Sequence, residues 1–236
     1  MSTNKNHCYN CGKELTEGNT TREHIPARNL FDGYSEEFKY NRITVPACRE
    51  CNNQYSYCDE EFRNMIGMIA DKKENDTVAS AATRSILRKK NGFDRLRFDL
   101  YGNVRGVEFN QDVIEEFHKK NFKGLFYHQY GYPLPNSYEL KVNIDEKDFS
   151  SFTLCLIEYL RDYFDWKCSG SHEIFSYCIQ PFRSGLKSKR EEDFELLESD
   201  NIIVGLMKYN GEHAAMVLAI RKQFLEEIRN THELIP

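Results

Sequence analysis

Four cysteines near the N-terminus have a spacing that is typical of a metal site. Cys8 with Cys11 and Cys48 with Cys51 form two Cys-x2-Cys pairs, separated by a few dozen residues. Each pair can present two thiolates to one ion at about 2.3 Å, and four thiolates complete the tetrahedral shell of zinc. The spacing therefore predicts one zinc site that joins the two pairs. Because all four ligand positions are filled, this ion is expected to be structural.

Three further residues are not needed to hold zinc and could perform hydrolytic chemistry. Glu23 and His24 lie between the two cysteine pairs, and Asn52 directly follows the last cysteine. Hydrolysis of a phosphodiester needs a divalent cation on the phosphate and a base that takes a proton from the attacking water. Glutamate and asparagine oxygens suit Mg²⁺ or Mn²⁺, and histidine suits the base. On a strand, adjacent side chains point to opposite faces, so Glu23 can face the cation and His24 the water.

This combination resembles the HNH endonucleases of the ββα-metal, treble-clef type. The resemblance rests on Cys-x2-Cys, Glu-His-Ile-Pro, an intervening strand and Cys-x2-Cys-Asn, over residues 6–66. It implies a metal-dependent endonuclease that hydrolyses phosphodiester bonds of nucleic acid, DNA rather than RNA, in a phage-related or defence setting. It also implies that Glu23 and Asn52 bind one catalytic Mg²⁺ or Mn²⁺ and that His24 is the general base.

The chain departs from this family pattern at one position. Ile43 stands where the family has a middle asparagine that orients the catalytic histidine. Asn41 is the only asparagine nearby, and Thr44 is a polar substitute. The resemblance therefore assigns the orienting role to Asn41, with Thr44 as the alternative.

Each of these residues also has an ordinary structural explanation. Glu23 and His24 are compatible with an exposed acid beside a histidine that caps a turn before Pro26, and Asn52 is compatible with the N-cap of the following helix. The alternative function is a catalytically silent zinc treble clef that binds nucleic acid or protein. The presence of Glu23, His24 and Asn52 argues against it, because a binding module needs none of them.

Positive charge is concentrated in one part of an acidic chain. The formal net charge is -5, whereas residues 62–105 hold ten Lys and Arg against five Asp and Glu. Phosphate binding depends on where charge is placed rather than on its sum. Nucleic-acid contacts are therefore assigned to Arg84, Arg88 and Lys89 in this range. Arg28 and Arg49, in the N-terminal part, are assigned as further phosphate contacts. A homodimer or a partner protein is a further possibility.

The apolar pattern predicts an α+β fold in two parts. Residues 1–74 are expected to form the zinc-anchored treble-clef HNH module, and residues 75–236 a mixed body of helices and antiparallel strands that supplies substrate contacts, dimerisation or partner docking. Helices are predicted from residue 53 onward and at 76–90, 111–129 and 148–163. Strands are predicted at 42–45, 138–144, 173–179, 202–209 and 213–220, with a β-hairpin at 95–109 and an exposed loop at 183–193.

No apolar stretch approaches the roughly 18 residues that a membrane helix requires, and the first residues do not resemble a signal peptide. We therefore expect a soluble, cytoplasmic protein. Eight cysteines could form a disulfide framework in an exported chain, but here the two pairs are interpreted as reduced metal ligands. The remaining cysteines are expected to be small core residues: Cys58, Cys155, Cys168 and Cys178.

Overall fold

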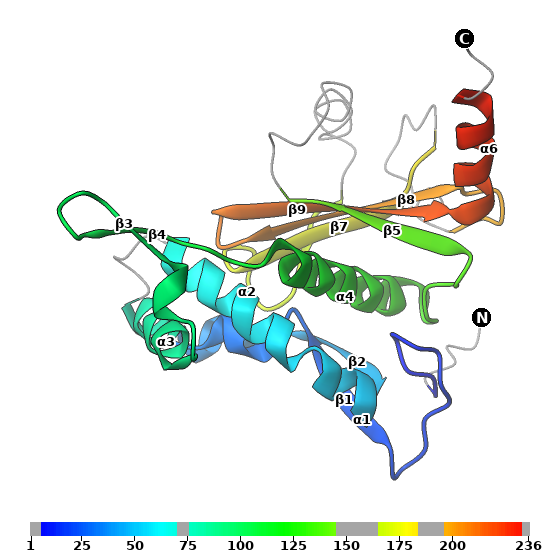
Figure 1. Ribbon diagram of the computed structural model, residues 1–236. Helices are drawn as coiled ribbons and strands as arrows, with labels where there is room; N and C mark the ends of the chain where they lie inside the picture. The colour runs from blue at the N-terminus through cyan, green and yellow to red at the C-terminus, as the bar shows by residue number, and fades with distance from the viewer. Residues whose placement is uncertain (1–5, 70–75, 145–164, 184–195, 233–236) are drawn as a thin grey trace.

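Helix α4 (Gln111–Tyr130) lies at the centre of the protein. The computed structural model describes residues 6–69, 76–144, 165–183 and 196–232. Figure 1 shows a five-stranded sheet on one side of α4 and the N-terminal hairpin with two helices on the other side. The combination of helices with antiparallel sheets confirms the predicted α+β class.

The N-terminal part consists of a β-hairpin followed by two helices. Its elements in chain order are β1 (Thr20–Ile25), η1 (Arg28–Phe31), η2 (Glu36–Lys39), β2 (Ile43–Cys48), α1 (Arg49–Gln54) and α2 (Ser56–Ile69). Strands β1 and β2 pair antiparallel, and this register places His24 opposite Thr44. The hairpin thus lies between the two cysteine pairs, and α1 begins directly after the third cysteine.

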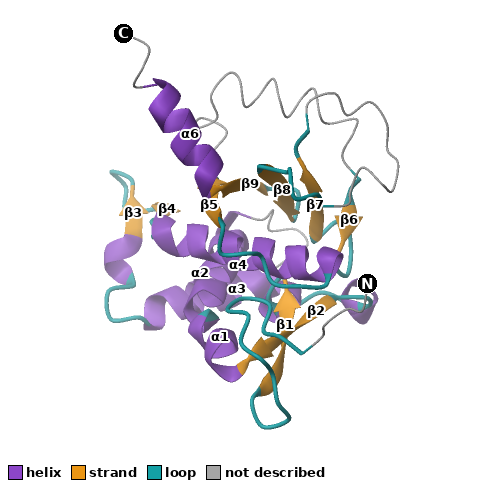
Figure 2. Cartoon of the chain, turned by 90° about the vertical axis from the view of Figure 1, so that its right-hand side faces the viewer, coloured by secondary structure: helices purple, strands orange, loops and turns teal. Residues whose placement is uncertain are grey.

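The rest of the chain forms an outlying helix and hairpin, the central helix and the large sheet. Besides α4, its elements are α3 (Asp76–Arg88), η3 (Phe93–Arg95), β3 (Leu96–Phe98), β4 (Val104–Val107), β5 (Tyr138–Asn143), β6 (Lys167–Cys168), β7 (Phe175–Pro181), β8 (Ile202–Tyr209), β9 (His213–Arg221) and α6 (Lys222–His232). The sheet has the order β5-β9-β8-β7-β6 and is antiparallel throughout. Figure 2 shows α4 running beneath it.

Both ends of α4 are encoded by local chemistry. The Asn110 side chain accepts a hydrogen bond from the backbone N–H of Asp112 at 2.9 Å, which is the usual function of an N-cap asparagine. At the other end Gly131 adopts φ 81°, a left-handed conformation that glycine enters without steric cost, and its N–H donates to the carbonyl of Tyr127. The helix therefore has a defined length between the two halves of the fold.

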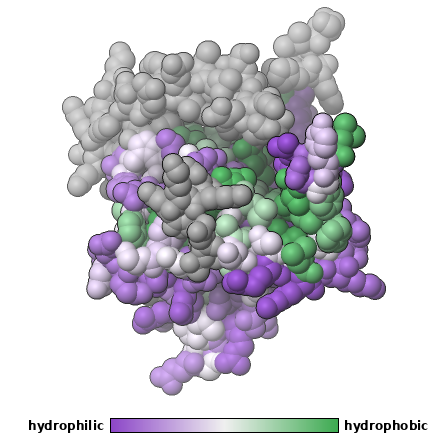
Figure 3. Space-filling view, turned by 90° about the vertical axis from the view of Figure 1, so that its left-hand side faces the viewer, coloured by the Kyte–Doolittle hydropathy of each residue, from purple (hydrophilic) through white to green (hydrophobic). Residues whose placement is uncertain are grey.

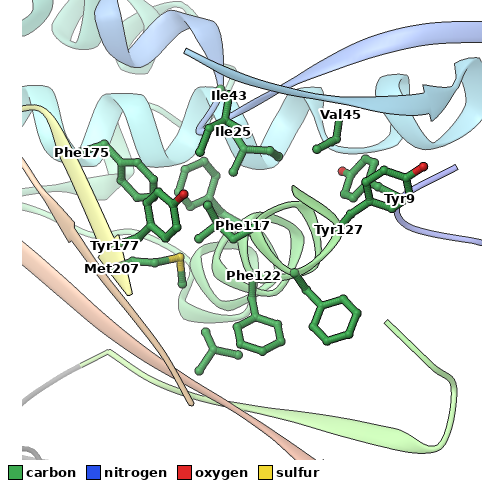
Figure 4. Close-up of a cluster of buried hydrophobic side chains, with 14 of the residues drawn as sticks. Tyr9, Ile25, Ile43, Val45, Phe117, Phe122, Tyr127, Phe175, Tyr177 and Met207 are labelled. Atoms are coloured by element: carbon green, nitrogen blue, oxygen red, sulfur yellow. The ribbon is translucent and has the colours of Figure 1, made fainter. Parts of the chain in front are cut away.

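One cluster of buried apolar side chains runs through both halves. Figure 4 shows it around α4, with members from the hairpin, the helix and the sheet: Ile25, Ile43, Val45, Phe117, Phe122, Phe175, Tyr177 and Met207. The helix approaches the sheet closely at Gly205, where an added Cβ would lie 2.5 Å from the Phe122 ring. The division into residues 1–74 and 75–236 stays a prediction, and both of these parts contribute to this shared core.

The predicted elements at α3, the β3–β4 hairpin, α4, β5, β7, β8 and β9 are confirmed. Strand β6 and helix α6 were not predicted. The helix predicted at 148–163 lies outside the described residues, as does nearly all of the loop predicted at 183–193. Among the helices in the described ranges, none is both long and apolar enough to cross a membrane.

Candidate metal and nuclease site

The four thiols predicted to bind zinc lie together. Their Sγ atoms are all within 4.8 Å of one another, and those of Cys11 and Cys48 are 3.9 Å apart. A tetrahedral ion with bonds of about 2.3 Å requires about 3.8 Å between its ligand atoms. Cys8, Cys48 and Cys51 are buried, Cys11 is exposed, and none is in a disulfide. The cluster therefore fits one tetrahedrally coordinated metal ion.

Neighbouring groups hold the thiols in place. The Cys48 sulfur accepts the backbone N–H of Cys51 at 3.4 Å and so caps α1. The Asn10 amide nitrogen donates to the Cys51 sulfur at 3.3 Å, and its oxygen accepts a hydrogen bond from Lys123 Nζ at 2.9 Å. Since Lys123 belongs to α4, the thiol cluster is connected to the central helix. Hydrogen bonds of this kind hold the ligand atoms of a metal site in position.

A separate pocket of about 290 Å³ lies where β1, η1, α1 and α2 meet. It brings together three residues that sequence reasoning assigned to catalysis, Glu23, His24 and Asn52, and one assigned to nucleic acid, Arg28. The other lining residues are Arg22, Ala27, Asn29, Ser56 and Asp59. The pocket therefore contains hard oxygen donors, an imidazole and two guanidinium groups.

The Glu23 carboxylate is buried, as the alternation along β1 requires, and within the described part of the chain only one of its oxygens has a partner. Oε1 is 3.0 Å from Lys120 Nζ, whereas Oε2 has no hydrogen-bond partner among the described residues. Asn29 also lines the pocket, and its buried Oδ1 atom likewise has no hydrogen-bond partner among the described residues. Burial raises the pKa of Glu23, and the Lys120 ammonium opposes that rise. Carboxylate and amide oxygens are the ligand types that hard divalent cations prefer.

Asp59 and Lys120 are charged residues of this site that were not among the site residues assigned from the sequence. Lys120 has 0% exposure, and its Nζ lies 2.7 Å from each carboxylate oxygen of Asp59. Burial raises the pKa of Asp59, and the ammonium opposes this effect. No local signal could have identified Lys120, because its partners lie in other elements.

His24 follows Glu23 on β1 and, unlike Glu23, is only partly buried. Burial lowers the pKa of its imidazole, and the positive charges of Arg42 and Arg28 lower it further. An imidazole with a lowered pKa is neutral at pH 7 and can accept a proton. Thr44 is exposed and directly opposite on β2.

The two asparagines predicted to serve the site have different positions. Asn52 lies in α1 and lines the pocket; the N-cap of that helix is Cys48, so the capping interpretation of Asn52 is wrong. Asn41 is exposed before β2 with φ 55°, its carbonyl accepts the N–H of Gly170 at 3.5 Å, and it does not line the pocket.

The basic residues predicted to contact nucleic acid fall in three places. Arg28 lines the pocket, and Arg49 is exposed at the start of α1 beside the thiol cluster. Arg84, Arg88 and Lys89 line a second pocket between α2 and α3. Part of the positive charge is therefore at the pocket and part at a distance from it.

Comparison with known proteins finds no matching family model, no matching curated protein and no matching solved structure.

Proposed function

We propose that this protein is a metal-dependent nuclease of the HNH type that hydrolyses phosphodiester bonds in nucleic acid, with DNA as the preferred substrate. The observation that carries the proposal is the meeting of Glu23, His24 and Asn52 in one pocket, in which the second oxygen of Glu23 has no partner among the described groups. The thiol cluster is proposed to hold a structural zinc ion.

The proposed role of each residue follows from its position. Glu23 Oε2 and the Asn52 amide oxygen would hold a Mg²⁺ or Mn²⁺ ion, which supplies polarisation of the phosphate and stabilises the leaving oxygen. His24 takes the proton of the attacking water as the water oxygen bonds to phosphorus. The bond from phosphorus to the ester oxygen then breaks, and that oxygen takes a proton from solvent. Arg28 lies where it can pair with the phosphate.

A second candidate function is a silent zinc module that binds nucleic acid or protein. Lys120 favours it, because an ammonium group already neutralises the carboxylates of Glu23 and Asp59. A cation that enters the pocket must then share Glu23 with Lys120 or displace it.

Incubation of the purified protein with plasmid and single-stranded DNA, with and without Mg²⁺ or Mn²⁺, separates the two functions. Removal of a positioned general base typically costs about 10²–10⁴-fold in rate. His24→Ala should therefore lose detectable cleavage. His172→Ala, a change at an exposed histidine outside the pocket, should cut like the wild type. Equal cleavage by wild type and His24→Ala would refute the proposed mechanism, and a wild type that binds DNA but never cuts it would support the silent module.

A further inference from the structure

Four cationic side chains line a groove between α2 and α3 that the proposed hydrolytic chemistry does not use. This cation groove has a volume of about 360 Å³. Its lining residues are Glu60 and Arg63 from α2, Ala81, Arg84, Ser85 and Arg88 from α3, and Lys89 directly after α3. The lining therefore has four positive charges and one negative charge. Figure 3 shows this side of the molecule, whose lower part is largely hydrophilic.

The single carboxylate of the lining is already engaged. Glu60 accepts a hydrogen bond from Ser85 Oγ at 2.5 Å, and its other oxygen is 3.6 Å from Lys89 Nζ. Lys89 also pairs with Glu61, which is buried beneath the groove and is paired with Arg95 as well. Lys89 is thus neutralised within the protein and is the least available of the four cations.

The three arginines, by contrast, retain unused donors. Arg84 and Arg88 are exposed and form no ion pair within the part of the chain that the structure describes. Arg63 Nε is buried and has no hydrogen-bond partner among those same residues. A buried N–H donor without a partner is rare and points to a ligand or a water that supplies the acceptor. Guanidinium groups offer paired donors that match phosphate oxygens.

Helix α2 connects this groove to the proposed active-site pocket. Asp59 lines the pocket, and Glu60 lines the groove. Arg63 follows Asp59 by four residues and Glu60 by three, so its side chain starts from the helix surface between the two. Arg63, which lines the groove, is about one helical turn, or about 5.4 Å, along α2 from Asp59, which lines the pocket. Successive phosphates of one strand of a duplex advance by about 3.4 Å along the axis.

We propose that the cation groove binds backbone phosphates of the nucleic-acid strand whose scissile phosphate enters the pocket. The proposal deepens the nuclease function proposed above. Entry of the scissile phosphate into the pocket rests on that function, whereas phosphate binding by the groove does not. Arg63 and the exposed guanidinium groups of Arg84 and Arg88 supply the donors. A good substrate is then a strand long enough to span the pocket and the groove, whereas a small phosphodiester reaches only the pocket.

The test compares two double charge reversals in the full chain with its metals. Arg84→Glu with Arg88→Glu removes charge from the groove. Lys222→Glu with Arg229→Glu makes the same change in net charge on exposed positions of α6, which Figure 1 shows far from α3. Binding of a labelled DNA oligonucleotide is measured by fluorescence anisotropy over a range of KCl concentrations. Loss of two phosphate contacts should lower the slope of log affinity against log salt by about 1.4–1.8 and weaken binding at least about tenfold at low salt.

Cleavage kinetics provide the second measurement. For long DNA the groove variant should show a raised KM at a kcat close to that of the wild type, and its rate on bis(p-nitrophenyl) phosphate should be unchanged. A groove variant whose affinity and salt slope equal those of the α6 variant would overturn the proposal, as would a wild type that does not bind DNA at low salt. Groove-dependent binding without any cleavage would support the groove as a phosphate site and refute the nuclease function.

Discussion

Replacement of Lys120 tests how the pocket is held together. The side chain has 0% exposure, and its ammonium lies 2.7 Å from Asp59 and 3.0 Å from Glu23. Removal of one partner of a buried ion pair typically costs about 3–5 kcal/mol, because the remaining charge stays buried without compensation. We therefore expect Lys120→Met to lower the free energy of unfolding by about 3–5 kcal/mol. Methionine is chosen because it keeps most of the side-chain volume. In a chain of this size the loss corresponds to about 6–20 °C in Tm.

Urea unfolding followed by circular dichroism measures the effect, and the preceding residue supplies a matched control. Lys119 carries the same charge on the same helix but pairs only with nearby carboxylates, Glu116 at 2.8 Å and Glu115 at 4.0 Å. Such pairs on a helix surface contribute about 0.5 kcal/mol or less each. Lys119→Met should therefore cost less than about 1 kcal/mol.

A compensating variant separates lost charge pairing from lost packing. Combining Lys120→Met with Glu23→Gln and Asp59→Asn removes the two stranded charges and should recover at least about half of the lost stability. A loss below about 1 kcal/mol for Lys120→Met alone would refute the inference that buried charge pairing holds the pocket. An equal loss in the triple variant would assign the effect to packing.

Two further predictions concern the core and the thiol cluster. The Nε2 atoms of His118 and His213 are 3.0 Å apart, and burial lowers the pKa of both rings, that of His213 to about 4. The unfolded rings bind protons below about pH 6.5, and the folded rings do not. The free energy of unfolding should therefore fall by about 1.4 kcal/mol for each of the two rings between about pH 7.5 and about pH 5.5. Urea unfolding of His213→Asn should show only the contribution of the remaining ring, about half of the two-ring total. Metal analysis should find about one tightly bound ion per chain in the wild type and in Cys168→Ser and a clear loss in Cys48→Ser; equal metal content in all three would contradict the assigned ligand set.

The parts of the site that the sequence predicted are those encoded over short distances. The cysteine pairs specify their own geometry, since two residues between the sulfurs place both on one ion. The adjacency of Glu23 and His24 on one strand predicts different environments for them, and in the structure Glu23 is buried whereas His24 is partly exposed. The position of Asn52 was predictable because it directly follows Cys51, and in the structure it lines the same pocket as Glu23 and His24. Strands β7, β8 and β9 of the large sheet were predictable because their apolar runs end at turns.

The parts that sequence reasoning missed depend on contacts between distant segments. Lys120 is separated from Asp59 by 61 residues, and Lys119 beside it is an ordinary surface lysine. An amphipathic helix has one buried face, and by that rule a lysine marks the exposed face. Helix α4 is covered by the sheet on one side and by the hairpin and α2 on the other, so that one of its lysines is buried. Only the three-dimensional arrangement reveals which one.

The central helix connects the two halves of the proposed site. Lys120 contacts the carboxylates of the pocket, and Lys123, one turn further along α4, contacts Asn10 and through it the sulfur of Cys51. The thiol cluster positions Asn52 because Cys51 is its neighbour, and α4 positions Glu23 through an ion pair. The thiol cluster and α4 thus each hold a different residue of one pocket. A fragment that ends near residue 74 would lack both lysines and expose the core face of β1, so the residues after 75 are part of the site itself.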